Sequence, residues 1–223
     1  DHLVDSAAQI PAIKSRIEAV RQFRLKSKKR ATVKAAEWSY RFDERKPISK
    51  SSIICVPVIS SENRPFLPVT LLSEGTVISN KAFSISGSEL WPLSIICSKL
   101  NISWVSAVCA KMRTDYSYTN TLGWNTFPVP KLTEKNKLDL TRCAENILLA
   151  REKHFPETIA ELYDHTKPMH DDLRQAHEKN DETLERIYIG RRFNNDTERL
   201  EKLFELYTKM TSSTTSNNME SGS

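Results

Sequence analysis

The sequence has few glycines and no long apolar run, and both absences exclude classes of protein. Only 5 of its 223 residues are glycine, which leaves little room for a glycine-rich nucleotide-binding loop after a strand. No apolar stretch approaches the length needed to cross a bilayer, and the first residues do not resemble a signal peptide. Because the chain starts at Asp1 within an expected helix, we expect it to be the C-terminal piece of a longer protein.

Cysteine and histidine are too few and too scattered to predict a metal or disulfide framework. The 4 cysteines lie far apart within apolar stretches, which indicates buried thiols in a reducing compartment. Among the 5 histidines, no pair has ligand spacing with a carboxylate nearby, so we expect no metal site. We interpret His177, which follows Ala176 on an expected helix, as a packing or capping residue.

Positive charge is concentrated at the beginning of the chain. The formal net charge is +5, yet residues 1–50 hold 13 Lys and Arg against 6 Asp and Glu, and residues 132–223 hold 14 against 18. A basic surface attracts nucleic-acid phosphates, whereas the acidic last third is unsuited to lie along a phosphate backbone. We therefore expect phosphate contacts from Lys28, Lys29 and Arg30, although a solvated surface loop would also explain this run.

Hydrophobic periodicity predicts a mixed α+β fold. Apolar residues spaced by three or four predict an amphipathic helix over residues 6–27. The apolar face of that helix would hold Ile10, Ile13, Ile17, Val20 and Phe23. Alternating segments separated by polar turns predict strands at residues 53–59, 67–72 and 76–85.

The remaining segments are predicted to be mainly helical. Residues 92–109 are less alternating and are expected to be helical, and residues 133–210 show three further helices. Asn195-Asp196 is a plausible cap for the last of these helices. The polar composition of residues 211–223 predicts a disordered tail.

Residues 113–118 alternate hydrogen-bonding side chains with aromatic ones. In an extended segment Arg113, Asp115 and Ser117 would share one face. An arginine can donate two bonds to guanine, and an aspartate can accept from cytosine, so this face suits the reading of base edges. The interleaved Tyr116 and Tyr118 would add DNA contacts. The alternative is an ordinary half-exposed strand with a local Arg–Asp pair.

Several collinear motifs favour the first interpretation, because together they resemble the MmeI-like (type IIL) restriction–modification proteins. The resemblance runs from about residue 16 to residue 210. The matching segments are Val20-Arg21-x-Phe23-Arg24, Ser60-Ser61-Glu62-Asn63-Arg64-Pro65-Phe66-Leu67-Pro68, Trp104-Val105-x-Ala107-Val108-Cys109, Asp115-Tyr116-x-Tyr118, Asn125-x-Phe127-Pro128-x-Pro130, Leu162-Tyr163-Asp164, Ala176-His177 and Leu203-Phe204-Glu205-Leu206-Tyr207.

The resemblance implies an organisation and a function. It implies a basic N-terminal helical segment at residues 1–50, a β-rich target-recognition domain with flanking helices at 51–131, and an α-helical C-terminal subdomain at 132–210. The parent protein would methylate adenine N6 in double-stranded DNA with S-adenosylmethionine, in the cytoplasm of a bacterium or archaeon. This chain would dock on the methyltransferase domain of the same parent, which could also carry a Mg²⁺-dependent nuclease.

The resemblance also implies DNA contacts and leaves one of them open. The resemblance places specificity positions within residues 113–117. Independently of it, we expect Ser61, Asn63 and Arg64 to contact DNA, because they lie on a short polar loop between expected strands and such loops often carry contacts. The family has arginine where this chain has Ser117, and its Ser-Ser-Glu-Arg-Arg motif has Asn63 here. For Arg64, the alternative is that its side chain holds the loop through Glu62 or another acid.

Catalytic motifs are missing from the sequence. It has neither Asn-Pro-Pro-Tyr nor Asp-Pro-Pro-Tyr, the motifs with which amino-methyltransferases of this type hold the flipped base. The Glu-x-Lys at residues 44–46 lies in a polar, loop-like stretch, so we interpret it as a coincidence rather than a nuclease motif. We expect this chain alone to catalyse no reaction and to hold no cofactor.

Two alternatives remain open at this point. The parent could be a phage-defence methyltransferase without a nuclease, in which this chain has the same recognition role. The chain could instead be a protein-interaction module whose acidic helices dock a partner subunit and which does not bind DNA.

Overall fold

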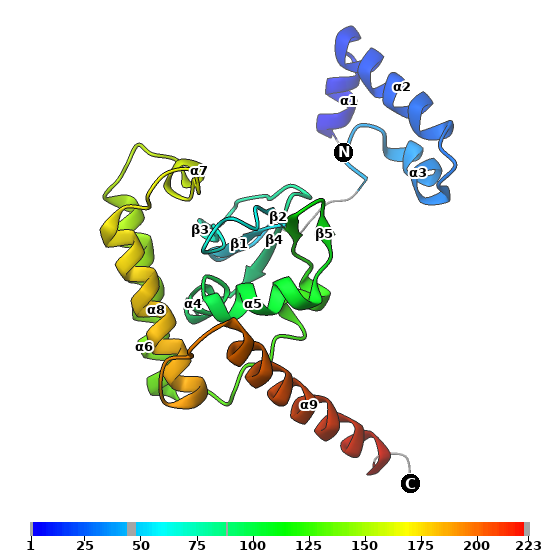
Figure 1. Ribbon diagram of the computed structural model, residues 1–223. Helices are drawn as coiled ribbons and strands as arrows, with labels where there is room; N and C mark the ends of the chain where they lie inside the picture. Colours follow the sequence, from blue (N-terminus) through cyan, green and yellow to red (C-terminus); the bar gives the residue numbers. More distant parts are fainter. Residues whose placement is uncertain (1, 44–47, 88, 221–223) are drawn as a thin grey trace. The chain divides into compact units, whose positions relative to one another are not determined.

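The computed structural model describes residues 2–43, 48–87 and 89–220, which form two units (Figure 1). The first unit comprises Asp1–Pro47 and the second Ile48–Ser223. The Glu-x-Lys sequence at residues 44–46 lies outside the described residues. No helix in the described part of the chain is both long and apolar enough to span a membrane.

The first unit is helical, and its long predicted helix is divided in two. Its elements are α1 (His2–Ala8), α2 (Pro11–Leu25), α3 (Arg30–Lys34) and the 3₁₀ helix η1 (Ala35–Trp38). Pro11 occupies the first position of α2, where its missing N–H costs no helical hydrogen bond. The chain turns at Gln9 and Ile10, so residues 6–27 do not form one continuous helix.

The apolar face predicted for α2 is not buried in this unit. Phe23 is 76% exposed and Ile10 is 50% exposed. The interior of the unit is formed by Arg24, Ala35 and Ala36 instead. The guanidinium of Arg24 donates to the carbonyl oxygens of Ala35, Trp38 and Arg41 at 2.7, 3.2 and 2.8 Å. These bonds orient α2 with Arg24 inward and leave the apolar stripe on the surface.

The second unit contains two small antiparallel sheets. In the first sheet, β1 (Ile53–Pro57) lies between β3 (Thr70–Leu72) and β4 (Ala82–Ser86). In the second, β6 (Asp115–Ser117) lies between β2 (Ile59–Ser60) and β5 (Lys111–Met112). The three predicted strand segments therefore all contain strands, although each strand is shorter than its segment.

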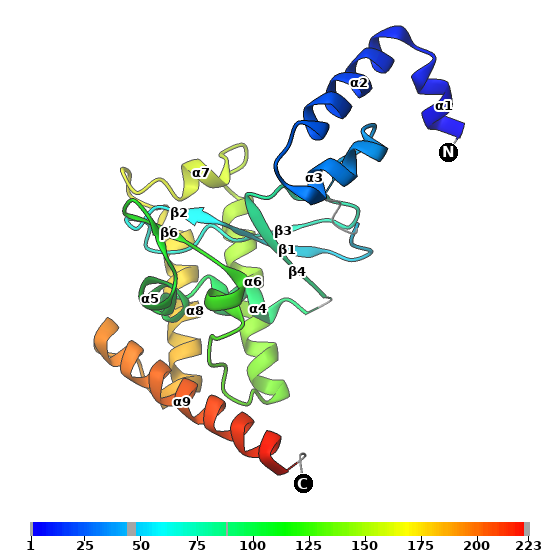
Figure 2. The same ribbon diagram turned by 90° about the vertical axis from the view of Figure 1, so that its right-hand side faces the viewer.

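Helices make up the rest of the second unit. The helices that follow the first sheet are α4 (Trp91–Ile96), α5 (Lys99–Val108) and the π-helix η2 (Asn120–Trp124). The last four are α6 (Glu134–Glu152), α7 (Ile159–Leu162), α8 (Asp171–Ile189) and α9 (Asp196–Glu220). Helices α6 and α8 lie side by side, with α7 at one end of the pair (Figures 1 and 2). The predicted mixed α+β class is confirmed.

Helix boundaries follow capping side chains. Residues 92–109 form two helices rather than one, because the Ser98 hydroxyl accepts from the backbone N–H of Asn101 at 3.2 Å and begins α5. The predicted Asn195 cap is present, since its side-chain oxygen accepts from Glu198 N at 2.9 Å. Helix α9 continues to Glu220, so residues 211–220 are helical rather than a disordered tail.

Two hydrophobic clusters form the core of the second unit. The first joins Ile54 and Val69 of the sheet region to Ala144 and Ile147 of α6. The second surrounds Trp104 of α5, against which the rings of Phe204 and Tyr207 of α9 pack at centroid distances of 5.0 and 5.6 Å. Both clusters contain residues from each side of position 131, so the predicted division there does not separate two cores.

A buried polar cluster of Arg151, Tyr163 and His177 ties the sheet region to the helices. Arg151 Nη1 donates to the carbonyl of Val69 at 2.5 Å, and its Nε donates to the Tyr163 hydroxyl at 2.8 Å. The same hydroxyl lies 2.5 Å from His177 Nε2. Burial and the charge of Arg151 hold the pKa of His177 well below its usual range. The imidazole also stacks on Phe66 at 4.0 Å, so the packing role predicted for His177 is confirmed.

Asp181 of α8 is a second buried charge, and its environment predicts a pH-dependent stability. The residue is 2% exposed. Its Oδ1 accepts from Lys99 N at 2.9 Å, while Oδ2 has no partner among the described residues. Burial raises the pKa of this carboxyl to about 7. Because that value is above the pKa of an unfolded aspartate, the folded state holds an extra proton between about pH 4 and 7. Asp181 therefore destabilises the fold increasingly as pH rises through this window.

We expect Asp181→Asn to be more stable than the wild type at pH 8. Its advantage should shrink by about 2–3 kcal/mol between pH 8 and pH 5, because the carboxyl is protonated in the folded state at the lower pH. Denaturant unfolding at both pH values measures this difference. Asp171→Asn, on the exposed first turn of the same helix, is the matched control. An Asp181→Asn advantage that does not change with pH would contradict the prediction.

Candidate nucleic-acid interface

Strands β5 and β6 form a hairpin that presents Arg113 at its tip. Met112 pairs with Asp115, so Arg113 and Thr114 form a two-residue turn. The backbone of Arg113 has φ 60°, the left-handed conformation that tight hairpin turns require. The hairpin is anchored to the rest of the unit because β6 also pairs with β2, Ser60 opposite Tyr116.

This geometry corrects the expectation of one extended face. Arg113 lies in the turn, so only Asp115 and Ser117 share a face of β6. Arg113 and Thr114 are exposed, and Asp115, Tyr116 and Ser117 are partly buried. Arg113 is therefore accessible at the end of the hairpin, and Asp115 is partly accessible on its flank, where β5 and β6 extend beyond the pairing with β2.

Tyr118 is a core residue rather than a surface contact. It is 2% exposed, and its ring packs 6.2 Å from the ring of Phe83. A Cβ atom built at Gly123 would come within 2.9 Å of the Tyr118 ring, so the glycine makes room for it. Burial raises the pKa of its hydroxyl. A direct contact between Tyr118 and DNA is incompatible with this conformation, because the neighbouring elements cover the side chain.

The loop that follows β2 lies beside the hairpin. Lys111 Nζ of β5 pairs with Glu62 of the loop at 3.0 Å and lies 5.5 Å above the ring of Tyr116. The Ser61 hydroxyl accepts from Asn63 N at 3.3 Å, and the Asn63 side chain is exposed. The structure thus brings together the two segments that the sequence predicted to contact DNA.

Arg64 anchors the loop that follows β2 to the helical region. Its side chain is partly buried, and its Nε donates to the carbonyl oxygen of Tyr163 at 3.1 Å. Tyr163 follows α7, so this bond holds the loop against the helical region. This contact favours the anchoring alternative, although the partner is a backbone carbonyl and not the expected acid Glu62.

The basic run lies in the first unit. Lys28, Lys29 and Arg30 are all exposed, at the junction between α2 and α3. Arg24, which the sequence placed on the helix leading into this run, is buried by its three carbonyl contacts. Arg24, like Arg151, donates hydrogen bonds inside the protein, so neither side chain adds to a basic surface. The number of charged residues in a segment does not reveal this.

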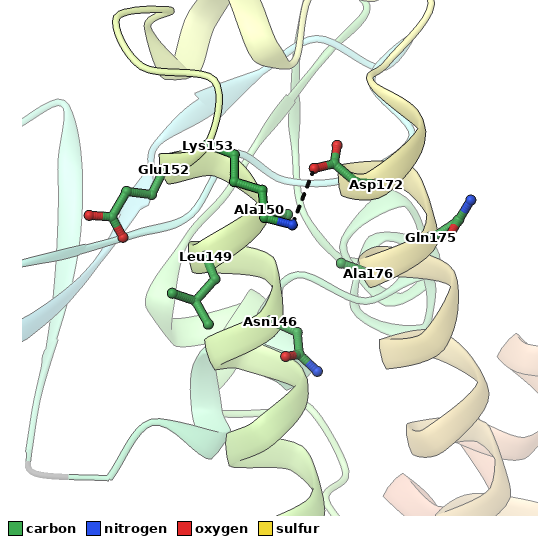
Figure 3. A pocket seen from close by; sticks show the side chains of 8 residues that line it. All are labelled: Asn146, Leu149, Ala150, Glu152, Lys153, Asp172, Gln175 and Ala176. Atoms are coloured by element: carbon green, nitrogen blue, oxygen red, sulfur yellow. Dashed lines mark ion pairs between the residues drawn. The ribbon is translucent and has the colours of Figure 1, made fainter.

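A shallow groove lies between α6 and α8 (Figure 3). Its volume is about 590 Å³, and its walls include Leu149 and Lys153 from α6 and its end, and Asp172 and Gln175 from α8. Lys153 Nζ lies 3.8 Å from Asp172 Oδ2. These side chains include no nucleophile with an adjacent base, so the groove has no recognisable catalytic arrangement.

Histidines that are distant in sequence meet at the end of this groove. His154 and His170 are ring neighbours, and Glu157 lies beside them. Sequence spacing predicted no metal-ligand cluster, because the two histidines are separated by a loop and a short helix. Only the return of the chain at α8 brings them together.

Comparisons with known proteins cover nearly the whole chain. A family model described as MmeI, target recognition domain, matches residues 1–131, and one described as MmeI, C-terminal domain, matches residues 132–215. DNA methyltransferase A of Bacillus subtilis (strain 168) is 38% identical over 202 residues, which cover 90% of this chain and 22% of that relative. A solved structure of the type IIL restriction–modification enzyme MmeI in complex with DNA has a TM-score of 0.87 and 30% identity, and covers 94% of this chain and 28% of that chain.

Proposed function

The chain belongs to the MmeI family, as its motifs predicted, and from this membership we propose that it binds double-stranded DNA and selects the target of a methyltransferase in the same polypeptide. The parent would transfer a methyl group from S-adenosylmethionine to adenine N6. A nuclease in the parent, if present, would use Mg²⁺. The chain spans about a fifth of the length of the curated relative that it matches, and these activities would belong to other parts of the parent. The parent protein would act in the cytoplasm, where the DNA is.

The observation that carries the proposal is the β5–β6 hairpin with Arg113 at its tip. A two-stranded ribbon fits the major groove of B-DNA, where arginine donates to guanine O6 and N7. Asp115 would accept from the paired cytosine or orient Arg113. Ser117 would lie on the same face of β6, and the adjacent Ser61, Asn63 and Tyr116 would contact the flanking backbone.

One anchoring residue and one further surface complete the proposal. Arg64 would act mainly by fixing the Ser61–Asn63 loop, because its Nε is bonded to Tyr163. The exposed apolar stripe of α2, with Phe23 76% exposed, would pack against the methyltransferase domain of the parent, since an exposed stripe of this kind marks an interaction surface.

We expect Lys28, Lys29 and Arg30 to supply affinity without sequence preference. Replacing all three with alanine should weaken binding to every duplex and reduce the slope of log Kobs against log salt by up to about 2.7, because each phosphate contact contributes about 0.9. Fluorescence anisotropy of the 223-residue chain with a mixed-sequence duplex at several salt concentrations measures both effects.

The matched control removes three exposed cations from helices α6 and α8, which lie in the acidic last third of the chain. Lys135→Ala, Arg142→Ala and Lys179→Ala together take away the same charge from residues that are 82, 65 and 66% exposed in their side chains. This control should leave the slope close to that of the wild type. If both triple variants lose the same affinity for DNA, only the net charge of the chain determines binding. No duplex binding by the wild type at low salt would refute the proposed function itself.

A further inference from the structure

His154, Glu157 and His170 form a compact group of potential metal ligands at the end of the α6–α8 pair. One ligand atom from each residue lies within 4.8 Å of the others. The two imidazole rings are stacked, with centroids 3.7 Å apart and planes inclined by 14°. Glu157 Oε1 lies 3.1 Å from His170 Nε2. We propose that these three residues bind one divalent transition-metal ion of the zinc type.

The backbone around the three residues is held in place by its own hydrogen bonds. His154 N donates to Arg151 O at 3.1 Å, and Glu157 N donates to His154 O at 2.9 Å, which closes a turn between two of the ligands. Thr158 then caps α7 with a reciprocal bond to Glu161. His170 is the residue that precedes α8, and its carbonyl accepts from Arg174 N at 2.9 Å. These bonds hold the backbone of the three ligand-bearing residues, whereas the two stacked rings must turn relative to one another to point at one ion.

The donor set matches the preferences of zinc-like ions. Two imidazoles and one carboxylate suit Zn²⁺, whose bonds to nitrogen and oxygen are about 2.0–2.2 Å and whose tetrahedral ligands are therefore about 3.3 Å apart. His170 Nε2 and Glu157 Oε1 are 3.1 Å apart, which is already close to this distance between ligands. Binding would turn one of the two stacked rings, because an imidazole donates to a metal in its own plane, and water would fill the fourth position.

Asp172 is placed as an orienting carboxylate. Its Oδ1 lies 2.8 Å from His154 Nε2, and this hydrogen bond lowers the pKa of Asp172. A carboxylate bonded to one imidazole nitrogen fixes the ring and leaves the other nitrogen for the metal. Lys153, 3.8 Å from the far oxygen of Asp172 (Figure 3), opposes cation binding and limits the affinity.

A bound ion would stiffen the segment that supports the DNA-facing loop. The ligand-bearing turn leads directly into α7 and Tyr163. The carbonyl of Tyr163 accepts from Arg64, and its hydroxyl accepts from Arg151. The ion would thus be structural, holding the α6–α7 turn against the start of α8 near these anchors.

Titration of the tag-free 223-residue chain with Zn²⁺ tests the proposal. Calorimetry should give one ion per chain, and free Zn²⁺ at 100 times Kd should raise Tm by about 5–10 °C, reversibly with a chelator. Mg²⁺ should not compete, because it prefers oxygen ligands. The double variant His154→Asn, His170→Asn should lose the stoichiometric site and the Tm rise.

Two single variants complete the experiment. His165→Asn removes an exposed histidine of the same connection that is outside the group, and it should bind like the wild type. Asp172→Asn should keep the stoichiometry and weaken binding about 10- to 100-fold, which also tests the site if the double variant does not fold. Zn²⁺ binding that is equal in the wild type and the folded double variant, or binding that Asp172→Asn leaves unchanged, would overturn the proposal.

Discussion

Arg113→Ala in the full-length protein should relax or abolish recognition of one base pair and leave the fold intact. A bidentate arginine contact with guanine discriminates by about 1–3 kcal/mol, which corresponds to about 5- to 150-fold in affinity for the cognate site. The fold should survive because Arg113 is an exposed residue of a two-residue turn. Sequencing of methylated sites in DNA from cells that carry each full-length gene measures the change base by base.

Thr114→Ala is the control, because it alters the other exposed residue of the same turn. It should leave the methylated sequence unchanged. If Arg113→Ala methylates the same site at an unchanged rate, Arg113 does not read a base. A uniform loss on all sequences, with a smaller salt slope, would assign Arg113 to phosphate.

Asp115 provides a second test of the same base pair. If Arg113 and Asp115 act together, either single change should destroy most activity, and a matched double change could transfer specificity to another base. Independent, additive effects of the two changes would show that they contact different positions.

Arg151→Met should lower the free energy of unfolding by about 2–4 kcal/mol. Arg151 is 9% exposed, and its guanidinium donates to the Val69 carbonyl and the Tyr163 hydroxyl. Each bond from a charged donor contributes about 1.5–3 kcal/mol, and methionine leaves the buried carbonyl without this donor. The corresponding fall in Tm is about 4–16 °C for a chain of this size. Denaturant unfolding at one pH measures the free energy directly.

Arg142→Met is the matched control on the same helix. Arg142 is 65% exposed in its side chain and lies 3.9 Å from Asp139, so its loss should change stability by no more than about 0.5 kcal/mol. If the two variants are equally stable, the Arg151 cluster does not hold the sheet region to the helices.

Periodicity and capping predicted the helices of the second unit well, because those signals are local. Leu173, Leu184 and Tyr188 lie at helical spacing on α8 and are buried, and Asn195 caps α9 as predicted. The apolar stripe of α2 is exposed in its unit for a physical reason. An amphipathic pattern indicates that one face of a helix packs against a partner, but it does not indicate that the partner lies within the same unit.

The features that could not be predicted depend on contacts between distant residues. The sequence around Arg113 does not predict a tight turn, because the glycine and asparagine typical of such turns are absent there. The burial of Arg24 and Arg151 depends on their bonds to the carbonyl oxygens of Ala35 and Val69, which are distant in the sequence. The His154–His170 pair depends on the path of the chain between α6 and α8.

The left-handed backbone of Arg113 limits how this hairpin can evolve new specificities. With φ at 60°, β-branched side chains are strongly disfavoured at the tip, whereas asparagine adopts this conformation far more readily than most residues. Asparagine is also the side chain that pairs with adenine N6 and N7. If Arg113 reads guanine as proposed, a change to adenine recognition through asparagine would therefore cost less in backbone conformation than a change to a β-branched residue. The turn would then bias which targets descendants of this protein can acquire.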